Sequence, residues 1–566
     1  MRQRMTVVMW VLAVALLVAL PVPQALADQP IAPKVKTAPG MEPTVPRGMP
    51  DLVPYWDFDP PKSPLFDVSK ITVSGDMRIR PEYRNNSNFG LTSVSTAGRA
   101  TGAAGQADAS QFVQQWARLG INYAVSPDVD TFLQMQYAKN WGANSTNTTA
   151  APQTGIPAND PNTLTSLGVR QAYMLIRNLG VDGLSMKAGR QLIVMGNHRL
   201  FGHFDWNNVG FSFDGVTLQY NQPLYEVYGG WVRLADAAAN ASANCSAGLG
   251  NACAGSSPAV GTPGSVAAST AGGANADLYF ARLALKPMAG VSIEPLWVWF
   301  DNKQSPGAPG TAPTSFYGTT PHANGQTRHT LGGRVAARAG MFDGTFEYYW
   351  QTGSMALTNS TNRLHVNANA MAAEGGITVA QLPWTPRLGL EFNYASGDGN
   401  AKNCNGQTGA GCGGNANTFE NLYPTNHILM GYADRMAWRN MVGYSASLQA
   451  KPSSTQQLDF RFWIFRKANN GDCWYTASQG CFSTATNTGN STGTLASNIA
   501  TSNSLYKEID GVYTLFFKGN KVAWQTGASY LISGQMLSQL ASGNAGANGA
   551  SAVNSIWAYT QLHINF

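Results

Sequence analysis

The sequence predicts an all-β fold: a transmembrane antiparallel β-barrel of about 18 strands, with short periplasmic turns and long extracellular loops. Three observations support this. The last residues, 556–566, alternate in polarity and end on Phe566; similar segments recur from residue 70 onward; and the gaps between segments are short and long in turn. An even-stranded outer-membrane barrel requires that alternation of gap lengths.

The C-terminal segment has a period of two over a length that crosses a bilayer as a tilted strand. One face carries Ile556, Ala558, Thr560, Leu562, Ile564 and Phe566, and the other carries Trp557, Tyr559, Gln561, His563 and Asn565. An alternating strand that stops on Phe is typical of bacterial outer-membrane barrels, in which the last strand closes against the first. Phe566 is therefore also the expected contact with the barrel-assembly machinery. The final strand of a soluble sheet would alternate in the same way. The rest of the chain therefore has to distinguish a membrane barrel from a soluble sheet.

The N-terminus predicts export. Arg2 and Arg4 precede an apolar run, and Ala25-Leu26-Ala27 follows it, which predicts a secretory signal peptide over 1–27. The Pro-rich stretch 28–68 lacks alternation and is expected to be a periplasmic arm, which leaves 69–566 for the barrel. No later stretch is long and apolar enough for a spanning helix.

The composition agrees with a barrel. Only 12% of residues are charged, about half the usual fraction, while Gly (60 residues) and aromatic residues (10%) are abundant. The net charge of +6, or +4 once Arg2 and Arg4 leave with the signal, is too small to indicate nucleic-acid binding.

Eighteen alternating segments are predicted strands. They lie at 70–84, 112–123, 130–140, 167–176, 184–191, 213–220, 225–233, 278–286, 291–299, 327–337, 342–352, 366–379, 387–395, 439–449, 457–465, 506–516, 522–531 and 556–566. Alternation is weakest at 184–191 and 366–379, so the count is uncertain by about two. A barrel of this size leaves a water-filled lumen.

Six cysteines form three pairs with equal spacing: Cys245 with Cys253, Cys404 with Cys412, and Cys473 with Cys481. Every pair lies in a long gap. In an exported chain this predicts three disulfides, each within one loop. Metal binding is the weaker interpretation because no His accompanies the pairs.

Charged residues follow the face that avoids lipid, where a charge costs about 2–4 kcal/mol at the bilayer midplane. The first strand places Arg78 and Arg80 on its polar face. The same test points a further set of residues into the lumen: Arg118, Arg170, Arg282, Arg328, Arg334, Arg439, Arg461, Glu347, Glu391, Asp459, Glu508 and Asp510. The phase of Arg190 is ambiguous. The set favours an anion-selective pore, although ordinary ion-pair ladders would look similar.

Three stretches resemble the alginate export family of outer-membrane porins: residues 187–220 with Gly-Arg-Gln, Arg-Leu-x-Gly, Asp-Trp and Phe-Asp-Gly-Val; Thr418–Asp434 with Tyr-Pro-x-x-His; and Ala395-Ser-Gly-Asp398. The resemblance implies an eighteen-stranded monomeric barrel with an arginine-rich constriction that passes a polyuronate. It makes Arg170, Arg190, Arg199, Arg439 and Arg461 candidates for that constriction, with Asp205 and Asp214 as acids near it. Gln171 and Asn197 depart from the family pattern, as do the cysteine pairs.

The predicted function is a passive channel in the bacterial outer membrane for an anionic, uronate-rich polysaccharide or another anionic solute. The alternative is a general or small-solute porin with no part in polysaccharide export. No nucleophile elbow or zinc motif supports an enzyme, and no cofactor or metal is expected. His427 is the best candidate for a functional histidine, although ordering a pore loop explains it better. An adhesin or receptor is a third class, but 28–67 is too short for a plug domain. Expected partners are the solute, outer-membrane lipid and possible periplasmic export components.

Overall fold

A computed structural model describes residues 70–87, 89, 109–141, 167–235, 276–302, 326–356, 363–399, 415–470, 472, 474–475, 477, 481–482, 502–543 and 552–566. The predicted signal peptide (1–27) and arm (28–68) lie outside these residues.

The three predicted disulfides also fall outside the part of the chain that the structure describes. Five cysteines are not among the described residues: Cys245, Cys253, Cys404, Cys412 and Cys473. Of Cys481, only the backbone is described. The pairing of Cys245 with Cys253, of Cys404 with Cys412 and of Cys473 with Cys481 therefore stays a prediction.

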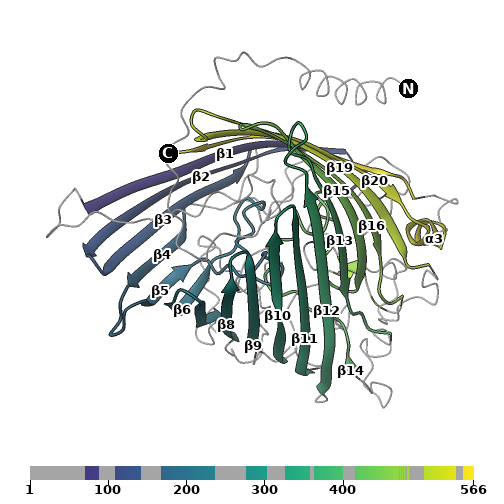
Figure 1. The fold of residues 1–566 in the computed structure, drawn as a ribbon. Coiled ribbons are helices and arrows are strands. Elements are labelled where there is room, and N and C mark those ends of the chain that lie inside the picture. The colour runs from purple at the N-terminus through teal and green to yellow at the C-terminus, as the bar shows by residue number, and fades with distance from the viewer. Residues whose placement is uncertain are drawn as a thin grey trace.

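Eighteen strands form one closed antiparallel wall, as predicted (Figure 1). They are β1 (Ile71–Asn85), β2 (Ala109–Ser126), β3 (Val129–Asn140), β4 (Gly168–Ile176), β5 (Leu184–Gln191), β6 (Phe213–Asn221), β7 (Tyr225–Ala235), β8 (Ala276–Met288), β9 (Val291–Asn302), β10 (Gln326–Ala339), β11 (Phe342–Ala356), β12 (Arg363–Thr378), β13 (Arg387–Ala395), β15 (Met441–Ser453), β16 (Gln456–Arg466), β19 (Ser504–Phe517), β20 (Val522–Ser533) and β21 (Ser555–Asn565). The two weakly alternating segments are strands β5 and β12.

The remaining elements are short. β14 (Asn415–Ala416) adds to β12, β17 (Trp474–Tyr475) pairs with β18 (Cys481–Phe482), and helix α3 (Gln535–Gly543) follows β20. Among the described residues, no helix has the length and apolar character needed to cross a membrane.

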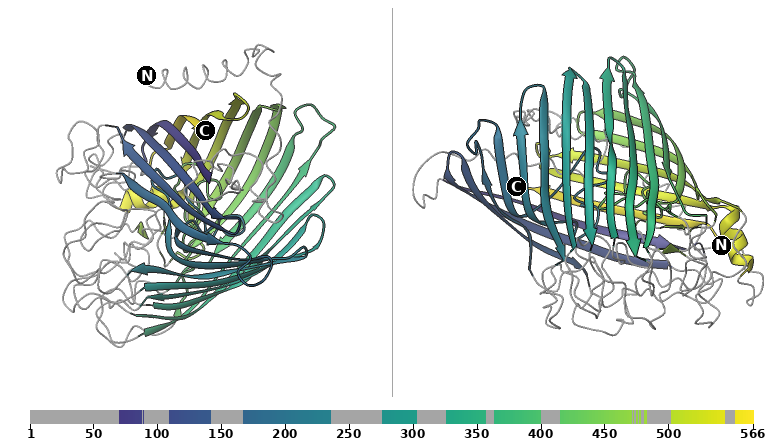
Figure 2. Two further views of the ribbon diagram at one scale, coloured as in Figure 1. Left: turned by 90° about the vertical axis from the view of Figure 1, so that its left-hand side faces the viewer. Right: turned by 90° about the horizontal axis from the view of Figure 1, so that it is seen from below.

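The barrel closes between β1 and β21, as the terminal alternation predicts (Figures 1 and 2). The amide of Gly75 donates to the carbonyl of Phe566 at 2.8 Å, and the amide of Phe566 donates back at 2.9 Å. The Phe566 ring lies over Gly75, where a Cβ would approach a ring carbon to 2.4 Å. Only glycine leaves room there for the aromatic ring that ends the chain.

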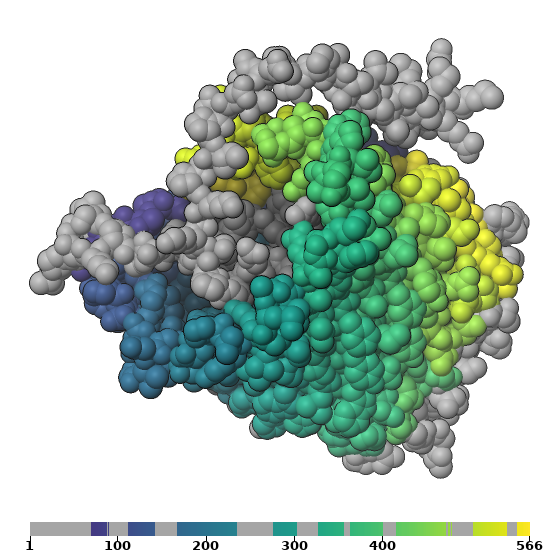
Figure 3. Space-filling view, viewed as in Figure 1, coloured from purple at the N-terminus to yellow at the C-terminus, as the bar shows by residue number. Residues whose placement is uncertain are grey.

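Side chains alternate between lipid and interior as predicted. On β21, Trp557 is 2% exposed and points inward, whereas Leu562 is 40% exposed and points outward. Large apolar residues on the outer face, such as Leu390 and Phe460, are among the most exposed of the chain. The outer surface of the barrel is continuous from teal through green to yellow (Figure 3).

Two long connections fold into the barrel. Segment A (192–212) joins β5 to β6, and segment B (417–440) precedes β15; most of their residues are buried. They lie side by side through a parallel bridge between Phe201 and Tyr423 and three backbone hydrogen bonds of 2.9 Å. From their sequences, both segments would be expected to be loops outside the barrel. Inside it, their apolar side chains are buried and their polar side chains find hydrogen-bond and ion-pair partners. These two segments fill much of the expected lumen.

Candidate functional site: the channel interior

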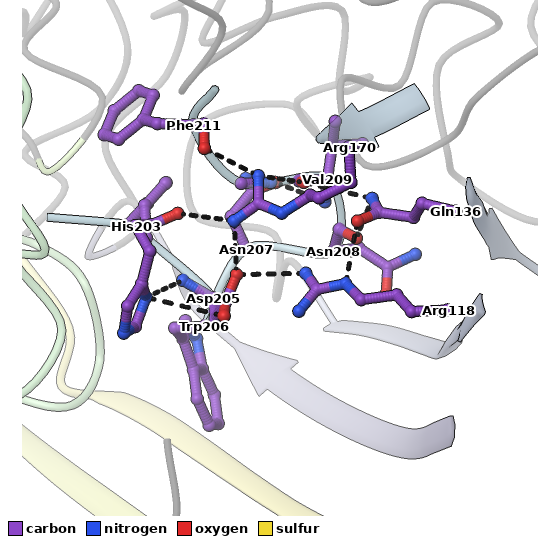
Figure 4. A network of polar contacts seen from close by, with 12 residues as sticks. Arg118, Gln136, Arg170, His203, Asp205, Trp206, Asn207, Asn208, Val209 and Phe211 are labelled. Atoms are coloured by element: carbon purple, nitrogen blue, oxygen red, sulfur yellow. Dashed lines mark hydrogen bonds and ion pairs between the residues drawn. The ribbon is translucent and has the colours of Figure 1, made fainter. Parts of the chain in front are cut away.

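Asp205 of segment A is the centre of the interior ion-pair network (Figure 4). Its Oδ1 lies 3.0 Å from Arg118 Nη2 of β2 and 2.6 Å from Arg170 Nη2 of β4. All three side chains are buried. One carboxylate therefore neutralises two guanidinium groups and fixes segment A to the wall.

Arg170 reaches the interior because β4 has a bulge. Gln134 pairs with Gln171 and Met135 with Val169, so Arg170 is an extra residue between them. A bulge of this kind redirects a side chain. The guanidinium also donates to the carbonyls of His203 (3.1 Å) and Phe211 (2.7 Å). Gly210, with φ of 71°, permits the close approach, since a Cβ there would lie 2.6 Å from Arg170 Nη2.

Arg78 and Arg80 of β1 hold the next residue of segment A. Arg78 donates to the carbonyls of Asp205 (2.7 Å) and Trp206 (3.0 Å), and Arg80 donates to that of Trp206 at 2.8 Å. The Arg80 guanidinium lies 3.7 Å from the centre of the Trp206 ring, a cation–π contact. The polar face of the first strand thus binds segment A rather than open water.

Arg199 and Arg461 share an acid on the far wall. Arg199 pairs with Glu347 of β11 (3.2 Å) and Glu391 of β13 (2.5 Å). Arg461 of β16 pairs with Asp459 (3.2 Å), lies 3.8 Å from Glu391, and donates to the carbonyl of Ile428 in segment B at 3.3 Å. Segment A is therefore attached to both walls of the barrel, and segment B bonds to Arg461 on this wall and, through Arg435, to the carbonyl of Ser87 just after β1.

His427 joins the two segments, in agreement with the interpretation that it orders a pore loop. Its ring stacks on that of Trp206 with centroids 3.6 Å apart and planes at 4°, and its Nδ1 lies 3.0 Å from Asp434 Oδ2. Trp206 is the contact residue that sequence reasoning missed. The Asp-Trp pair of the family motif was the only signal that pointed to it.

Two predicted lumen residues, Arg190 and Asp214, face outward, and a third, Arg439, lies in segment B rather than on a strand. Arg190 and Asp214 pair with each other at 2.8 Å, and both share the outward phase of Leu218, which is 46% exposed. They face away from the interior, and the Asp214 side chain is 54% exposed. Arg439 is buried but precedes β15, which starts at Met441; its guanidinium lies 4.3 Å from the Tyr475 ring centre.

The inward charges are unevenly distributed. Near β1 to β4, the arginines 78, 80, 84, 118 and 170 outnumber the acids Asp76, Glu82, Asp130 and Asp205. Near β12, β13, β16 and β19, acids prevail: Glu374, Glu391, Asp459, Glu508 and Asp510 outnumber Arg199, Arg387 and Arg461. The interior thus has one wall rich in arginine and one rich in carboxylates. In the described part of the chain, no cluster of three or more His, Cys, Asp or Glu is arranged to hold a metal ion.

Burial and neighbouring charges shift the pKa values of two side chains of segment A. Burial alone would raise the pKa of Asp205, but Arg118, His203 and Arg170 together lower it well below its usual range, so the carboxylate stays ionised. Burial, with His203 and Arg334 nearby, lowers the pKa of His198 well below 6.5 despite the opposing effect of Asp205. His198 is therefore neutral in the folded chain.

The shift of His198 predicts that segment A is held less tightly in acid. In the unfolded segment this histidine binds a proton below about pH 6.5, whereas in the folded one it does not, so the difference favours release as pH falls through that value. We expect brief openings in planar bilayers to become more frequent between pH 8 and pH 5. His198→Gln should remove that change, and an equally steep increase in the variant would contradict the assignment.

A closed eighteen-stranded barrel with an apolar outer face and a charged interior defines an outer-membrane channel protein. Its family follows from a sequence comparison: the profile described as "Alginate export" matches residues 69–239 and 270–530. The chain belongs to the alginate export family and is located in the bacterial outer membrane. Family and fold support an outer-membrane channel.

Solved structures with a similar fold include outer-membrane proteins of Pseudomonas aeruginosa. OccK9 (OpdG) is 9% identical with a TM-score of 0.48, over 88% of this chain and 99% of that one. OpdK is 9% identical with a TM-score of 0.47, over 88% and 99%. No curated protein sequence matches the chain significantly.

Proposed function

We propose that this channel passes an anionic solute, with a uronate-rich polysaccharide as the first candidate. The observation that carries this proposal is the arginine-rich wall formed by β1, β2 and β4 around Asp205. Fixed guanidinium groups in a low-dielectric wall raise the local concentration of carboxylates, and several weak sites in series let a charged chain leave as readily as it enters.

Asp205 indicates how such a solute would be bound. Its carboxylate lies between Arg118 and Arg170 at ion-pair distance, which is the geometry that a uronate carboxylate would adopt on the same two residues. Segment A therefore acts as an internal competitor. A solute carboxylate that displaces Asp205 forms ion pairs with the same two arginines. Arg118 and Arg170 therefore stay paired while segment A moves aside.

A small-solute porin is the second candidate, and the attachment of segment A to both walls favours it. Arg199 ties this segment to Glu347 and Glu391, while Arg118 and Arg170 tie it to the opposite side. A polymer needs that segment to move, whereas a small anion does not. In either case we propose a monomeric channel, with periplasmic export components as possible partners for the polymer.

The double variant Arg118→Gln/Arg170→Gln tests anion selectivity. Two unit charges about 6 Å apart at an effective dielectric near 20 interact by roughly 2.8 kcal/mol, so even strong screening leaves a several-fold loss of anion preference. The zero-current potential in a salt gradient measures it. Arg190→Gln is the matched control, since this arginine also pairs with an aspartate but faces outward.

The outcomes separate clearly. A smaller anion preference in the double variant and an unchanged one in the control support the proposal. An unchanged potential in the double variant would show that these arginines only hold segment A. Competition of uronate oligomers with chloride, compared with neutral oligosaccharides of equal length, then distinguishes the polysaccharide from small anions.

A further inference from the structure

Charged side chains on the outward face of the barrel are confined to one end. Each lies within about four residues of the end of its strand from which the long connections leave. At the other end, the regularly paired parts of the described strands carry no outward-facing charge. We call this set the outer belt: Lys139, Arg190, Asp214, Arg233, Asp277, Asp301, Arg363, Arg466 and Lys507.

The order of outward side chains along the strands places the belt relative to the membrane. On β7, β8 and β9, exposed apolar residues come first, then an aromatic ring, then a charge. Aromatic rings mark the interface of a barrel with the bilayer, and Tyr279 and Trp299 stack there with centroids 4.9 Å apart. On these three strands the charge follows two residues further on, in the headgroup layer, and the remaining belt residues lie at the same long-connection end of their strands. On three strands the order reads Val227, Trp231, Arg233; Leu285, Tyr279, Asp277; and Ile293, Trp299, Asp301.

Basic residues outnumber acids in the belt by six to three. The acids lie on β6, β8 and β9, where Arg190 pairs with Asp214 at 2.8 Å and Arg233 with Asp277 at 2.6 Å. The other four basic residues have no acid opposite them on the neighbouring strands. Their register partners are Gln115 for Lys139, Ala356 for Arg363, Val442 and Ser504 for Arg466, and Ile464 and Ile532 for Lys507.

We propose that the outer belt binds the phosphate groups of lipid headgroups in the outer leaflet, with a phosphorylated glycolipid as the ligand. Arginine and lysine at the headgroup layer recognise phosphate through charge-assisted hydrogen bonds. The hydrocarbon-facing residues directly below hold the acyl chains of the same molecule. Because the belt is on the outside of the barrel, this site is separate from the channel interior and does not depend on the proposed function.

The test compares two triple variants. Arg363→Gln/Arg466→Gln/Lys507→Gln removes three exposed belt residues, and Arg338→Gln/Lys518→Gln/Lys521→Gln removes three exposed basic residues at the short-turn end. Each folded protein in detergent is titrated with lipid A that carries its phosphates and with the same lipid after dephosphorylation. Heat-dependent gel migration confirms that each variant is folded before the titration.

We expect the belt variant to bind phosphorylated lipid A about 100-fold more weakly than the unmodified protein, from about a factor of five per basic residue. The short-turn variant should bind as the unmodified protein does, and dephosphorylated lipid should bind all three weakly. Equal binding of both lipids would show that acyl chains alone are recognised. Unchanged binding by the belt variant, or full displacement of the lipid by equimolar inorganic phosphate, would overturn the proposal.

Discussion

Single-channel conductance is expected to rise several-fold when Asp205 is replaced by alanine. The substitution leaves Arg118 and Arg170 buried next to each other without their shared carboxylate. Breaking a buried ion pair by removing one partner costs about 3–5 kcal/mol, and here two pairs are lost. Segment A can regain hydration for both guanidinium groups by leaving the β1–β4 wall, which opens the interior.

Asp214→Ala is the matched control for this experiment. It also removes an aspartate paired with an arginine at 2.8 Å, but the pair faces outward and the Asp214 side chain is 54% exposed. Exposed ion pairs contribute about 0–1 kcal/mol, so its conductance should stay unchanged. Equal conductance of the Asp205 and Asp214 variants would show that Asp205 does not hold segment A in place.

The pKa of Asp205 adds a condition to that result. Because the surrounding charges lower it well below its usual range, the carboxylate contributes its stabilisation at every pH above about 4 and loses it only on stronger acidification. The difference in conductance between the unmodified protein and Asp205→Ala should therefore persist from pH 8 to pH 5. If it vanished within that range, the carboxylate would have to be protonated there.

The second large effect is expected at Phe460, in the middle of β16. It is 50% exposed on the outer face, between the inward-facing Asp459 and Arg461. Phe460→Arg puts a charge against hydrocarbon. It should lower the free energy of unfolding of the protein in vesicles by about 2–4 kcal/mol. Urea titration of the refolded protein measures this difference.

Ile464→Arg is the control on the same strand. Ile464 has the same outward phase but lies two residues from Arg466 of the outer belt, where the cost of arginine falls to about 0–1 kcal/mol. A large difference between the two variants locates the hydrocarbon layer on β16. Equal destabilisation would contradict the position of the membrane interface inferred from the aromatic and charged rows.

The phase of most regular strands was predictable, because alternation is local. The face of each side chain on β21 follows from the polarity of its neighbours two positions away. A polar or charged residue on the lipid face would destabilise the barrel. Position 190 shows where this local information ends. Its neighbours Leu184, Met186 and Ala188 share its parity, so its phase was ambiguous, and the family motif around it suggested the lumen. In the structure Arg190 faces outward, paired with Asp214.

The interior depended on contacts that no local pattern contains. Asp205 lies 87 positions from Arg118, and Arg199 lies 192 positions from Glu391. Whether segment A leaves the barrel or enters it depends on whether those guanidinium groups find carboxylates at short range.

The sequence by itself thus determined the closed eighteen-stranded barrel, its seam at Phe566 and the face of most charged residues. Only the tertiary structure decided that segments A and B fill the interior and that its arginines are already paired. The physical reason is that strand phase follows from a period of two, whereas ion pairing is set by distances across a closed barrel.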